Sequence, residues 1–349
     1  MAQKTEGRTA RDKKAKRFLW NPERAIEVGP KSVSQLLDEM AQTGFQGKRL
    51  GEAARIWSEM TQAKGLTIFM GYAGSMSTTG QWKIVRWLIE NRYIDVLVST
   101  GANVSEDIFE AMGHKYYQGT WMANDEELLD AKIDRFYDIY ADEYDYRELE
   151  SLIKEFAGTL DAKRTYSTRE FLNRFGEYQW NKGIKSITAT AWKHNVPIYS
   201  PGLIDSGYGV ALSLLKREGK LVRLDQTQDM EELGQIAERT KKTGVVYIGG
   251  GVPKDTIQLA TIIKSLAEGG NEETPHDYAI QITTDSPQWG GLSGCTLEEA
   301  ISWGKIAADS KRSVVYCDAT LALPLIVHAM NEKVKGRKDP PDLRWVFKA

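Results

Sequence analysis

The stretch Val245-Val-Tyr-Ile-Gly-Gly-Gly-Val-Pro-Lys254 places a short apolar run directly before three consecutive glycines. An apolar run of this length, bounded by turn residues, is typical of a buried parallel strand. Residues 256–267 follow with an amphipathic pattern that predicts a helix. Glycines at such a junction let a backbone approach a ligand closely, and a helix N-terminus favours phosphate. The spacing is not that of the dinucleotide-binding motif, so a tight turn and a phosphate-binding loop both stay open.

Five other apolar runs end in the same way, at Gly, Ser, Thr or Asp: residues 67–71, 95–101, 196–200, 278–283 and 314–318. Amphipathic segments such as 82–91 and 231–243 lie between these runs and predict helices. Alternating strands and helices predict the α/β class, with a single large, doubly wound, mostly parallel sheet of Rossmann-like type. Ligands of such sheets bind at the carboxyl ends of the strands.

The composition excludes several classes of protein. The 349 residues are 41% hydrophobic and 27% charged, with a formal net charge of −2, which excludes wholesale disorder and a general nucleic-acid binder. Two cysteines, Cys295 and Cys317, exclude a disulfide scaffold and fit a reducing cytoplasm. The apolar stretch 321–327 is too short to span a bilayer, and the four histidines show no metal-ligand spacing. We therefore expect a cytoplasmic protein with no metal, no membrane contact and no nucleic-acid partner.

Charge divides the chain into an arm, one main domain and a tail. Residues 1–17 hold seven basic groups against two acids, so we expect residues 1–30 to form a basic, flexible N-terminal arm. Residues 31–335 form one domain, and 336–349 form a C-terminal tail. Within the domain, residues 124–150 hold eleven acids and three bases. They predict a solvated acidic helical face or an oligomer contact, with an acidic funnel for a cationic substrate as the alternative.

Polar residues follow two of the predicted strands, and each has a structural and a chemical interpretation. Residues 71–80 contain four hydroxyl side chains and three glycines. These hydroxyls could cap the next helix or bind phosphate oxygens. Asp318 ends another strand, where it could cap a helix or accept from ribose hydroxyls.

The segment from Thr296 to Lys305 is the third candidate. Thr296 and Glu299 have the spacing of a capping box. Position alone makes Lys305 an exposed lysine, because it lies about 200° around an ideal helix from Trp303. Its neighbour Trp303 favours another interpretation, since desolvation against an indole lowers the pKa of a lysine and makes its amine a nucleophile.

Taken together, the motifs resemble those of the deoxyhypusine synthase family, over residues 32–328. They occur in this order: Phe69-Met-Gly-Tyr72, Asp95-Val-Leu-Val-Ser-Thr-Gly101, Tyr199-Ser-Pro-Gly-Leu-Ile-Asp205, Gly249–Gly251, Glu299-Ala-Ile-Ser-Trp-Gly-Lys305-Ile and Val315-Tyr-Cys-Asp-Ala319. The resemblance implies that residues 31–335 are an NAD-binding catalytic domain. It implies a homotetrameric transferase that moves a 4-aminobutyl group from spermidine, through an imine on a lysine, to an acceptor amine.

The resemblance also implies roles for individual residues. Lys305 is the catalytic residue that carries the imine. The residues that would bind the polyamine substrate are Glu106, Asp255, Glu299 and Trp303. The residues that would contact NAD are Gly74, Ser75, Thr78, Thr100, Gly101, Ala102, Asp205, Gly250, Thr284, Asp285, Asp318 and Ala319.

Four positions depart from the family pattern. Val210 and Leu292 stand where the family has aspartates, Asp255 replaces a histidine, and Ser105 replaces one of two adjacent acids. Fewer carboxylates remain to pair with a polycation. We therefore expect a small free amine as acceptor, giving homospermidine, rather than a protein lysine of translation factor 5A, giving deoxyhypusine.

Two other function classes stay open. One is a noncatalytic sensor of NAD or polyamines, which would keep the glycine loops without needing the lysine. The other is a sirtuin-like, NAD-consuming deacylase. Such an enzyme normally needs four zinc cysteines, and this chain has two.

Overall fold

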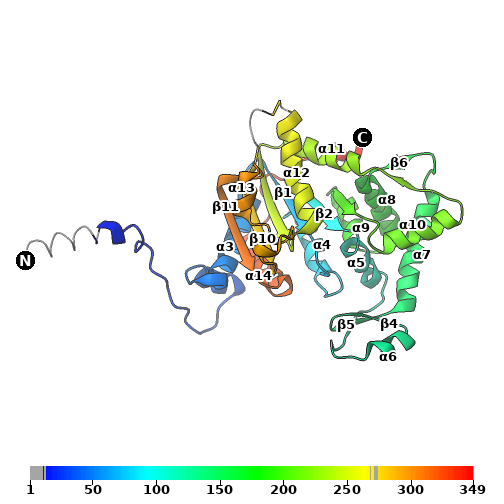
Figure 1. Ribbon diagram of the computed structural model, residues 1–349, viewed down its shortest axis with the longest axis horizontal. Coiled ribbons are helices and arrows are strands. Elements are labelled where there is room, and N and C mark those ends of the chain that lie inside the picture. The colour runs from blue at the N-terminus through cyan, green and yellow to red at the C-terminus, as the bar shows by residue number, and fades with distance from the viewer. Residues whose placement is uncertain (1–10, 12, 268, 271–273, 349) are drawn as a thin grey trace, which may run out of the picture.

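A six-stranded parallel sheet forms the centre of the protein (Figure 1). The computed structural model describes residues 11, 13–267, 269–270 and 274–348. The strands, in their order across the sheet, are β11 (Ile306–Tyr316), β10 (His276–Thr283), β9 (Lys242–Ile248), β1 (Leu66–Tyr72), β2 (Val96–Thr100) and β7 (Ile198–Gly202). All six predicted strands are confirmed, and so is the single doubly wound, mostly parallel sheet.

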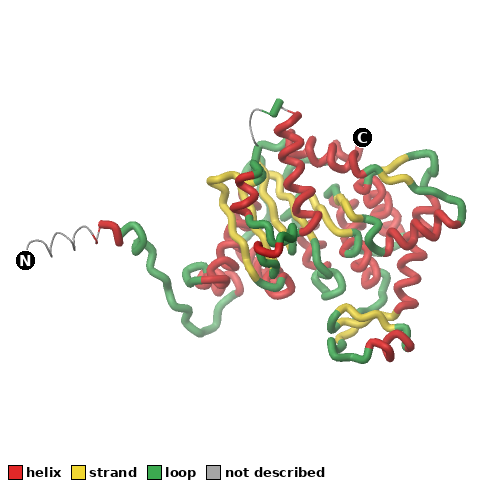
Figure 2. The backbone as a smooth tube through the Cα atoms, in the orientation of Figure 1, coloured by secondary structure: helices red, strands yellow, loops and turns green. Residues whose placement is uncertain are grey.

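Helices cover both faces of this sheet (Figure 2). They are α2 (Val33–Met40), α3 (Phe45–Gln62), α4 (Trp82–Glu90), α5 (Asn103–Ala111), α7 (Glu143–Thr159), α8 (Thr168–Asn181), α9 (Ile187–His194), α10 (Gly207–Arg217), α11 (Gln226–Glu238), α12 (Gly251–Ala267), α13 (Leu297–Ser302) and α14 (Ala319–Lys333). None of the described helices is long and apolar enough to cross a membrane.

Alternate residues of the central strands enter two separate cores. In β1, Ile68 and Met70 join the core that includes residues of α3, α4 and α14, whereas Phe69 joins the core beneath α11, α12 and α13. In β9, Val246 joins the first of these cores and Tyr247 joins the second. A strand that is buried on both faces needs apolar residues throughout, which explains why these runs are continuous rather than alternating.

The predicted helix over 231–243 is wrong at its C-terminal end. Helix α11 ends at Glu238, and β9 begins at Lys242. Residues 242–244 pair in register with β1, Lys242 opposite Leu66. Pairing with a distant strand therefore overrides the local helical pattern.

The acidic segment contains two strands of a small sheet as well as helices. Strands β3 (Tyr117–Gln118), β5 (Ile139–Asp142) and β4 (Ile133–Phe136) form a three-stranded antiparallel sheet beside α6 (Asp125–Asp130). This sheet and α6 project from the body in Figure 1. Helical structure is confirmed for α6 and for α7, but the β4–β5 hairpin was missed.

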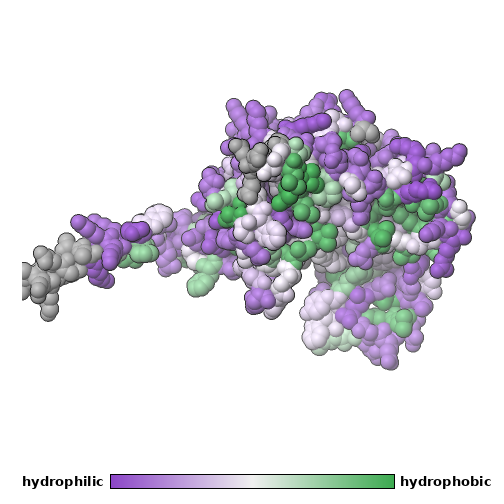
Figure 3. Space-filling model, turned by 45° about the horizontal axis from the view of Figure 1, so that its top comes forward, coloured by the Kyte–Doolittle hydropathy of each residue, from purple (hydrophilic) through white to green (hydrophobic). Residues whose placement is uncertain are grey.

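The two ends of the chain behave differently. The arm residues 13–30 are almost all exposed, and the arm stands off the body (Figure 3); the predicted arm also includes residues 1–10 and 12, which lie outside the described residues. The C-terminal segment instead packs on the body through the short helix η2 (Arg344–Lys348), where Val346 is buried. Arg337 is buried too, and its guanidinium lies 3.0 Å from the carboxylate of Asp95. Two-residue strands β6 (Thr165–Tyr166) and β8 (Arg223–Leu224) pair at the periphery.

Candidate functional site

Two cavities open near the N-terminus of α12, and the first of them lies at the carboxyl ends of strands. One, of about 310 Å³, lies beyond β1, β2 and β7 and is lined by Gly251 to Pro253 on the α12 side. The other, of about 410 Å³, is lined by the next residues of α12 and by the segment around Lys305. The first turns of one helix therefore contribute to both cavities.

Most of the predicted cofactor-binding residues near β1, β2 and β7 line the first cavity. These are Gly74, Ser75, Thr100, Ala102 and Asp205, and Glu106 joins them. Burial raises the pKa of the Glu106 carboxyl to about 7. Its Oε2 atom is buried and has no hydrogen-bond partner among the described residues. Glu106 is thus an unsatisfied acid at the wall of a cavity, where a cationic or hydrogen-bond-donating ligand would complete its contacts.

The hydroxyls of the 71–80 loop bond within the loop and to α5. Ser75 Oγ lies 2.8 Å from Thr78 Oγ1, and Ser77 Oγ donates to the carbonyl of Asn103 at 2.7 Å. Thr78 is buried. Helix α4 has no side-chain cap, so the interpretation of these hydroxyls as caps of the next helix is wrong.

Lys305 lies outside the helix that was expected to carry it. The hydroxyl of Thr296 caps α13 by accepting from the amide of Glu299 at 2.9 Å, which is one half of the predicted capping box, and the helix ends at Ser302. Gly304 then adopts a positive φ of 66°, a conformation that glycine reaches without strain, and the chain enters β11.

This turn directs the lysine inward. The Lys305 side chain is only 13% exposed, and its Nζ atom lies 2.9 Å from Oδ1 of Asp255. The expectation of an exposed lysine, based on helical geometry, is therefore wrong. The Nζ atom is 5.5 Å from the ring centroid of Trp303, whose side chain is 62% exposed.

The lysine cavity brings together all the predicted amine-binding residues except Glu106. Asp255, Glu299 and Trp303 line it with Lys305. Leu292, one of the departures from the family pattern, lines the same cavity. Glu106 lies in the first cavity, on the other side of the start of α12.

The other predicted cofactor residues line neither cavity. Gly101 and Gly250 are packing positions: a Cβ at Gly101 would lie 2.5 Å from the carbonyl oxygen of Leu203, and one at Gly250 would lie 2.6 Å from Ser293 Cα. Asp318 caps α14 by accepting from the amide of Thr320 at 2.7 Å, and Ala319 is the first residue of that helix. Thr284 and Asp285 follow the end of β10.

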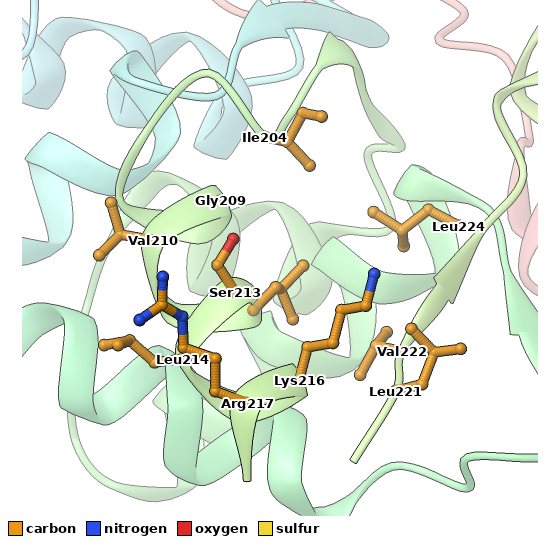
Figure 4. A pocket seen from close by; sticks show the side chains of 11 residues that line it. Ile204, Gly209, Val210, Ser213, Leu214, Lys216, Arg217, Leu221, Val222 and Leu224 are labelled. Atoms are coloured by element: carbon orange, nitrogen blue, oxygen red, sulfur yellow. The ribbon is translucent and has the colours of Figure 1, made fainter. Parts of the chain in front are cut away.

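Val210 lies away from Leu292 in this chain. It lines a shallow groove of about 760 Å³ over α10, together with Ile204, Leu214 and Leu221 (Figure 4). The groove is mainly apolar, with Lys216 and Arg217 at its edge (Figure 4).

Sequence reasoning missed three residues near Lys305. Lys254 is fully buried although it is a lysine; Gln281 contacts it, and Cys295 lines the same cavity. Only the position of Lys254, one residue before Asp255 at the start of a helix, could have suggested a role in the site. Among the described residues, no group of three or more His, Cys, Asp or Glu is placed to hold a metal ion.

Comparisons with known proteins identify the family. The deoxyhypusine synthase family model matches residues 35–330. "Probable deoxyhypusine synthase 2" of Methanosarcina acetivorans is 46% identical over 323 residues, covering 92% of this chain and 93% of the relative. "Deoxyhypusine synthase-like protein" of Chlorobaculum parvum is 36% identical and covers 88% of this chain and 89% of its own length.

A solved structure agrees with this fold. The crystal structure of a protein assigned as a deoxyhypusine synthase in Entamoeba histolytica has a TM-score of 0.64 at 19% identity, covering 90% of this chain and all of that one. At that identity the likeness concerns the fold alone. The family model and the curated relatives carry the assignment: the chain belongs to the deoxyhypusine synthase family, whose members are aminobutyl-transferring enzymes.

Proposed function

We propose that this protein transfers a 4-aminobutyl group from spermidine or a related amine to an acceptor amine, using NAD and a covalent imine on Lys305. The observation that carries the proposal is the inward-facing Lys305, held 2.9 Å from the carboxylate of Asp255 in a cavity that also holds Glu299 and Trp303. An amine nucleophile needs a neighbouring base and a pocket that restricts water. This cavity offers both.

The first cavity suits NAD as cofactor. Asp205 lines it with an exposed side chain that could accept from ribose hydroxyls, and the positive φ of Gly74 leaves open space beside the backbone. Bound NAD would take up a hydride from the carbon next to the nitrogen of the donor amine and later return it to the product. Glu106, which lines the same cavity and whose Oε2 atom has no hydrogen-bond partner among the described residues, would hold the donor nitrogen.

The chain's own residues account for the lysine steps. Forming the imine requires the neutral amine of Lys305, and Oδ1 of Asp255 is within hydrogen-bond distance to accept its proton. The Trp303 ring provides a face for an ammonium group. Glu299 adds a carboxylate at the cavity wall.

A small free amine is the acceptor that this cavity favours. Its two carboxylates, Asp255 and Glu299, stand beside two lysines, Lys254 and Lys305. Leu292 lines the wall where the family has an aspartate. Since one carboxylate is already paired with Lys305, the cavity keeps little negative charge for a polycation. We therefore propose homospermidine rather than deoxyhypusine as the product.

We also propose a homotetramer that works in the cytoplasm. The apolar groove over α10 supports subunit contact, because Ile204, Val210 and Leu214 are substantially exposed there. Subunit contact could also bring a Glu106 cavity close to a Lys305 cavity of another copy.

Mass spectrometry after borohydride reduction tests the proposal. The protein is incubated with NAD and a panel of di- and polyamines, and then reduced. We expect a butylamine adduct on Lys305 and a new polyamine product. NAD or amine binding without any adduct would instead indicate a sensor, and NAD cleavage to nicotinamide would indicate a deacylase.

A further inference from the structure

A buried lysine at the wall of the lysine cavity contacts a buried glutamine. The Lys254 side chain is 1% exposed, and Gln281 of β10 is also 1% exposed. Lysine is almost never fully buried unless it is paired. No carboxylate of a described residue forms an ion pair with Lys254: its ammonium donates to Oε1 of Gln281 at 3.0 Å and to the carbonyl oxygen of Cys295.

The glutamine extends this contact to two further backbone segments. Its Nε2 atom donates to the carbonyl oxygen of Gly249 at 2.9 Å and to that of Ser293 at 2.8 Å. The two side chains thus join the glycine turn before α12 to the loop of residues 284–296, which connects β10 to α13. We refer to Lys254 and Gln281 together as the bridge.

The bridge holds the middle of the loop. The two ends bond to their neighbours along the chain: the amide of Asp285 donates to Thr283 Oγ1, and the carbonyl of Thr296 accepts from the amide of Ala300. Between these ends, the other backbone hydrogen bonds among described residues stay inside the loop, such as those from the amides of Gly294 and Cys295 to the carbonyl of Gly291. Away from the ends of the loop, the carbonyls of Ser293 and Cys295 are the ones that described residues outside the loop hold, and both are held by the bridge. Leu292 and Cys295, on the same loop, form a wall of the lysine cavity.

We propose that Lys254 and Gln281 are positioning residues, which fix the 284–296 loop against α12 and so set the shape of the amine side of the cavity. Lys254 precedes Asp255 in α12, so one turn of that helix holds both the loop and the partner of Lys305. Burial lowers the pKa of Lys254, and Glu299 and Asp255 offset this lowering only through Coulomb attraction, without an ion pair to Lys254 among the described residues. A lysine that is kept buried without an ion-pair partner costs free energy, which suggests that Lys254 has a role that an apolar side chain cannot fill.

Cysteine reactivity tests this inference without relying on catalysis. The rates at which iodoacetamide modifies Cys295 and Cys317 are measured by peptide mass spectrometry on the folded protein. In Gln281→Leu we expect Cys295 to react about tenfold faster, as expected when a buried hydrogen bond that restrains local opening is lost. Lys254→Met should accelerate the reaction less, because it also removes a charge that lowers the pKa of the Cys295 thiol. Cys317, which follows β11 outside the loop, should keep its rate.

Two further variants separate a local bridge from general destabilisation. Gln179→Leu removes another buried amide, far from the loop in the α8–α9 pair, and should leave the Cys295 rate unchanged. The double variant Lys254→Met/Gln281→Leu should react no faster than either single variant, because both disrupt the same attachment. Three results would overturn the inference. They are a Cys295 rate in the double variant that multiplies the accelerations of the two single variants, an equal acceleration of Cys317, and an unchanged Cys295 rate in the bridge variants.

Activity provides a second readout, and this part rests on the proposed function. Both bridge variants should raise the KM for the amine while the affinity for NAD is retained. If no amine is a substrate, the proposed function fails but the cysteine rates still decide the bridge. If Lys254→Met does not fold, Gln281→Glu replaces it. That variant keeps an acceptor for Lys254 but removes the donor to Ser293, so an unchanged Cys295 rate would again contradict the inference.

Discussion

The Nζ atom of Lys305 lies 2.9 Å from Oδ1 of Asp255, although fifty positions separate the two residues in the sequence. Asp255 comes from the first turns of α12, and Lys305 from the turn between α13 and β11. The family pattern that the sequence resembles has a histidine at the position of Asp255. In this protein the carboxylate contacts the lysine directly, so Asp255 is already paired with Lys305 before any substrate amine could pair with it.

Replacing Lys305 should abolish transfer. Both Lys305→Ala and Lys305→Arg should lose product and borohydride-trapped adduct, because arginine stays protonated and cannot form the imine. NAD affinity, measured by calorimetry, should stay within error, since Lys305 does not line the first cavity. Turnover by Lys305→Arg would contradict the covalent mechanism.

Asp255→Asn should act on kcat more than on KM. Asparagine keeps the shape of the side chain but cannot accept a proton from Lys305, and the loss of a general base typically costs about 10²–10⁴ in rate. Steady-state kinetics with the best amine measures the two constants separately. A raised KM with an unchanged kcat would mean that Asp255 binds the substrate and does not activate the lysine.

Amine binding should depend on pH through Glu106. Burial raises the pKa of its carboxyl from 4.5 to about 7, so the group is neutral below that pH and charged above it. Aliphatic amines stay protonated over this range, since their pKa is near 10. Affinity for the amine should therefore rise as the pH increases from about 6 to about 8, by at most the 10- to 150-fold expected of about 1.5–3 kcal/mol for a charged hydrogen bond.

Glu106→Gln is the matched control for that pH effect. Glutamine keeps the size of the side chain but does not titrate, so the rise in affinity with pH should vanish. Asp107, the next residue, also has a pKa raised to about 7 by burial. Its Oδ2 atom accepts from the amide of Ile187, so Asp107→Asn reports on structure instead. If the affinity for the amine still rises with pH in Glu106→Gln, a group other than Glu106 causes the effect.

Leu292→Asp should improve the use of spermidine. It restores a carboxylate to the wall of the lysine cavity, where an ammonium could pair with it. Val210→Asp alone should change little in an isolated chain, because Val210 lines the groove over α10. Comparing kcat/KM for spermidine in the two single variants and in the double variant tests this. A gain from Val210→Asp in the assembled protein would place that groove against the active site of a neighbouring copy.

The buried pair of Asp95 and Arg337 should support the whole fold. Arg337 also donates to the carbonyls of Met60 and Leu66 at 2.6 Å, so it ties the C-terminal segment to α3 and β1. Removing one partner of a buried pair costs about 3–5 kcal/mol. Urea denaturation of Arg337→Met should show a loss of that size, whereas Lys338→Met, the exposed neighbour, should unfold like the wild type.

The sequence by itself determined the sheet and its two-sided burial. Continuous apolar runs such as 245–248 can be satisfied only where both faces of a strand are covered, and this requirement is local to each run. The cap at Thr296 was equally local, because it depends on one hydroxyl and an amide three residues away. The motifs from Phe69 to Ala319, taken together and in their order, were sufficient to indicate the family.

Only the tertiary structure decided which residues meet at the site. Helical geometry placed Lys305 in solvent, but the turn at Gly304 directs it onto Asp255, a partner that no local rule could identify. Tertiary packing also places Glu106 and Lys305 in different cavities, and it places Val210 in the groove over α10 while Leu292 lines the lysine cavity. The roles of Lys254 and Gln281 follow from contacts between α12, β10 and a loop. Such contacts depend on how distant segments pack together, and spacing along one chain does not encode that packing.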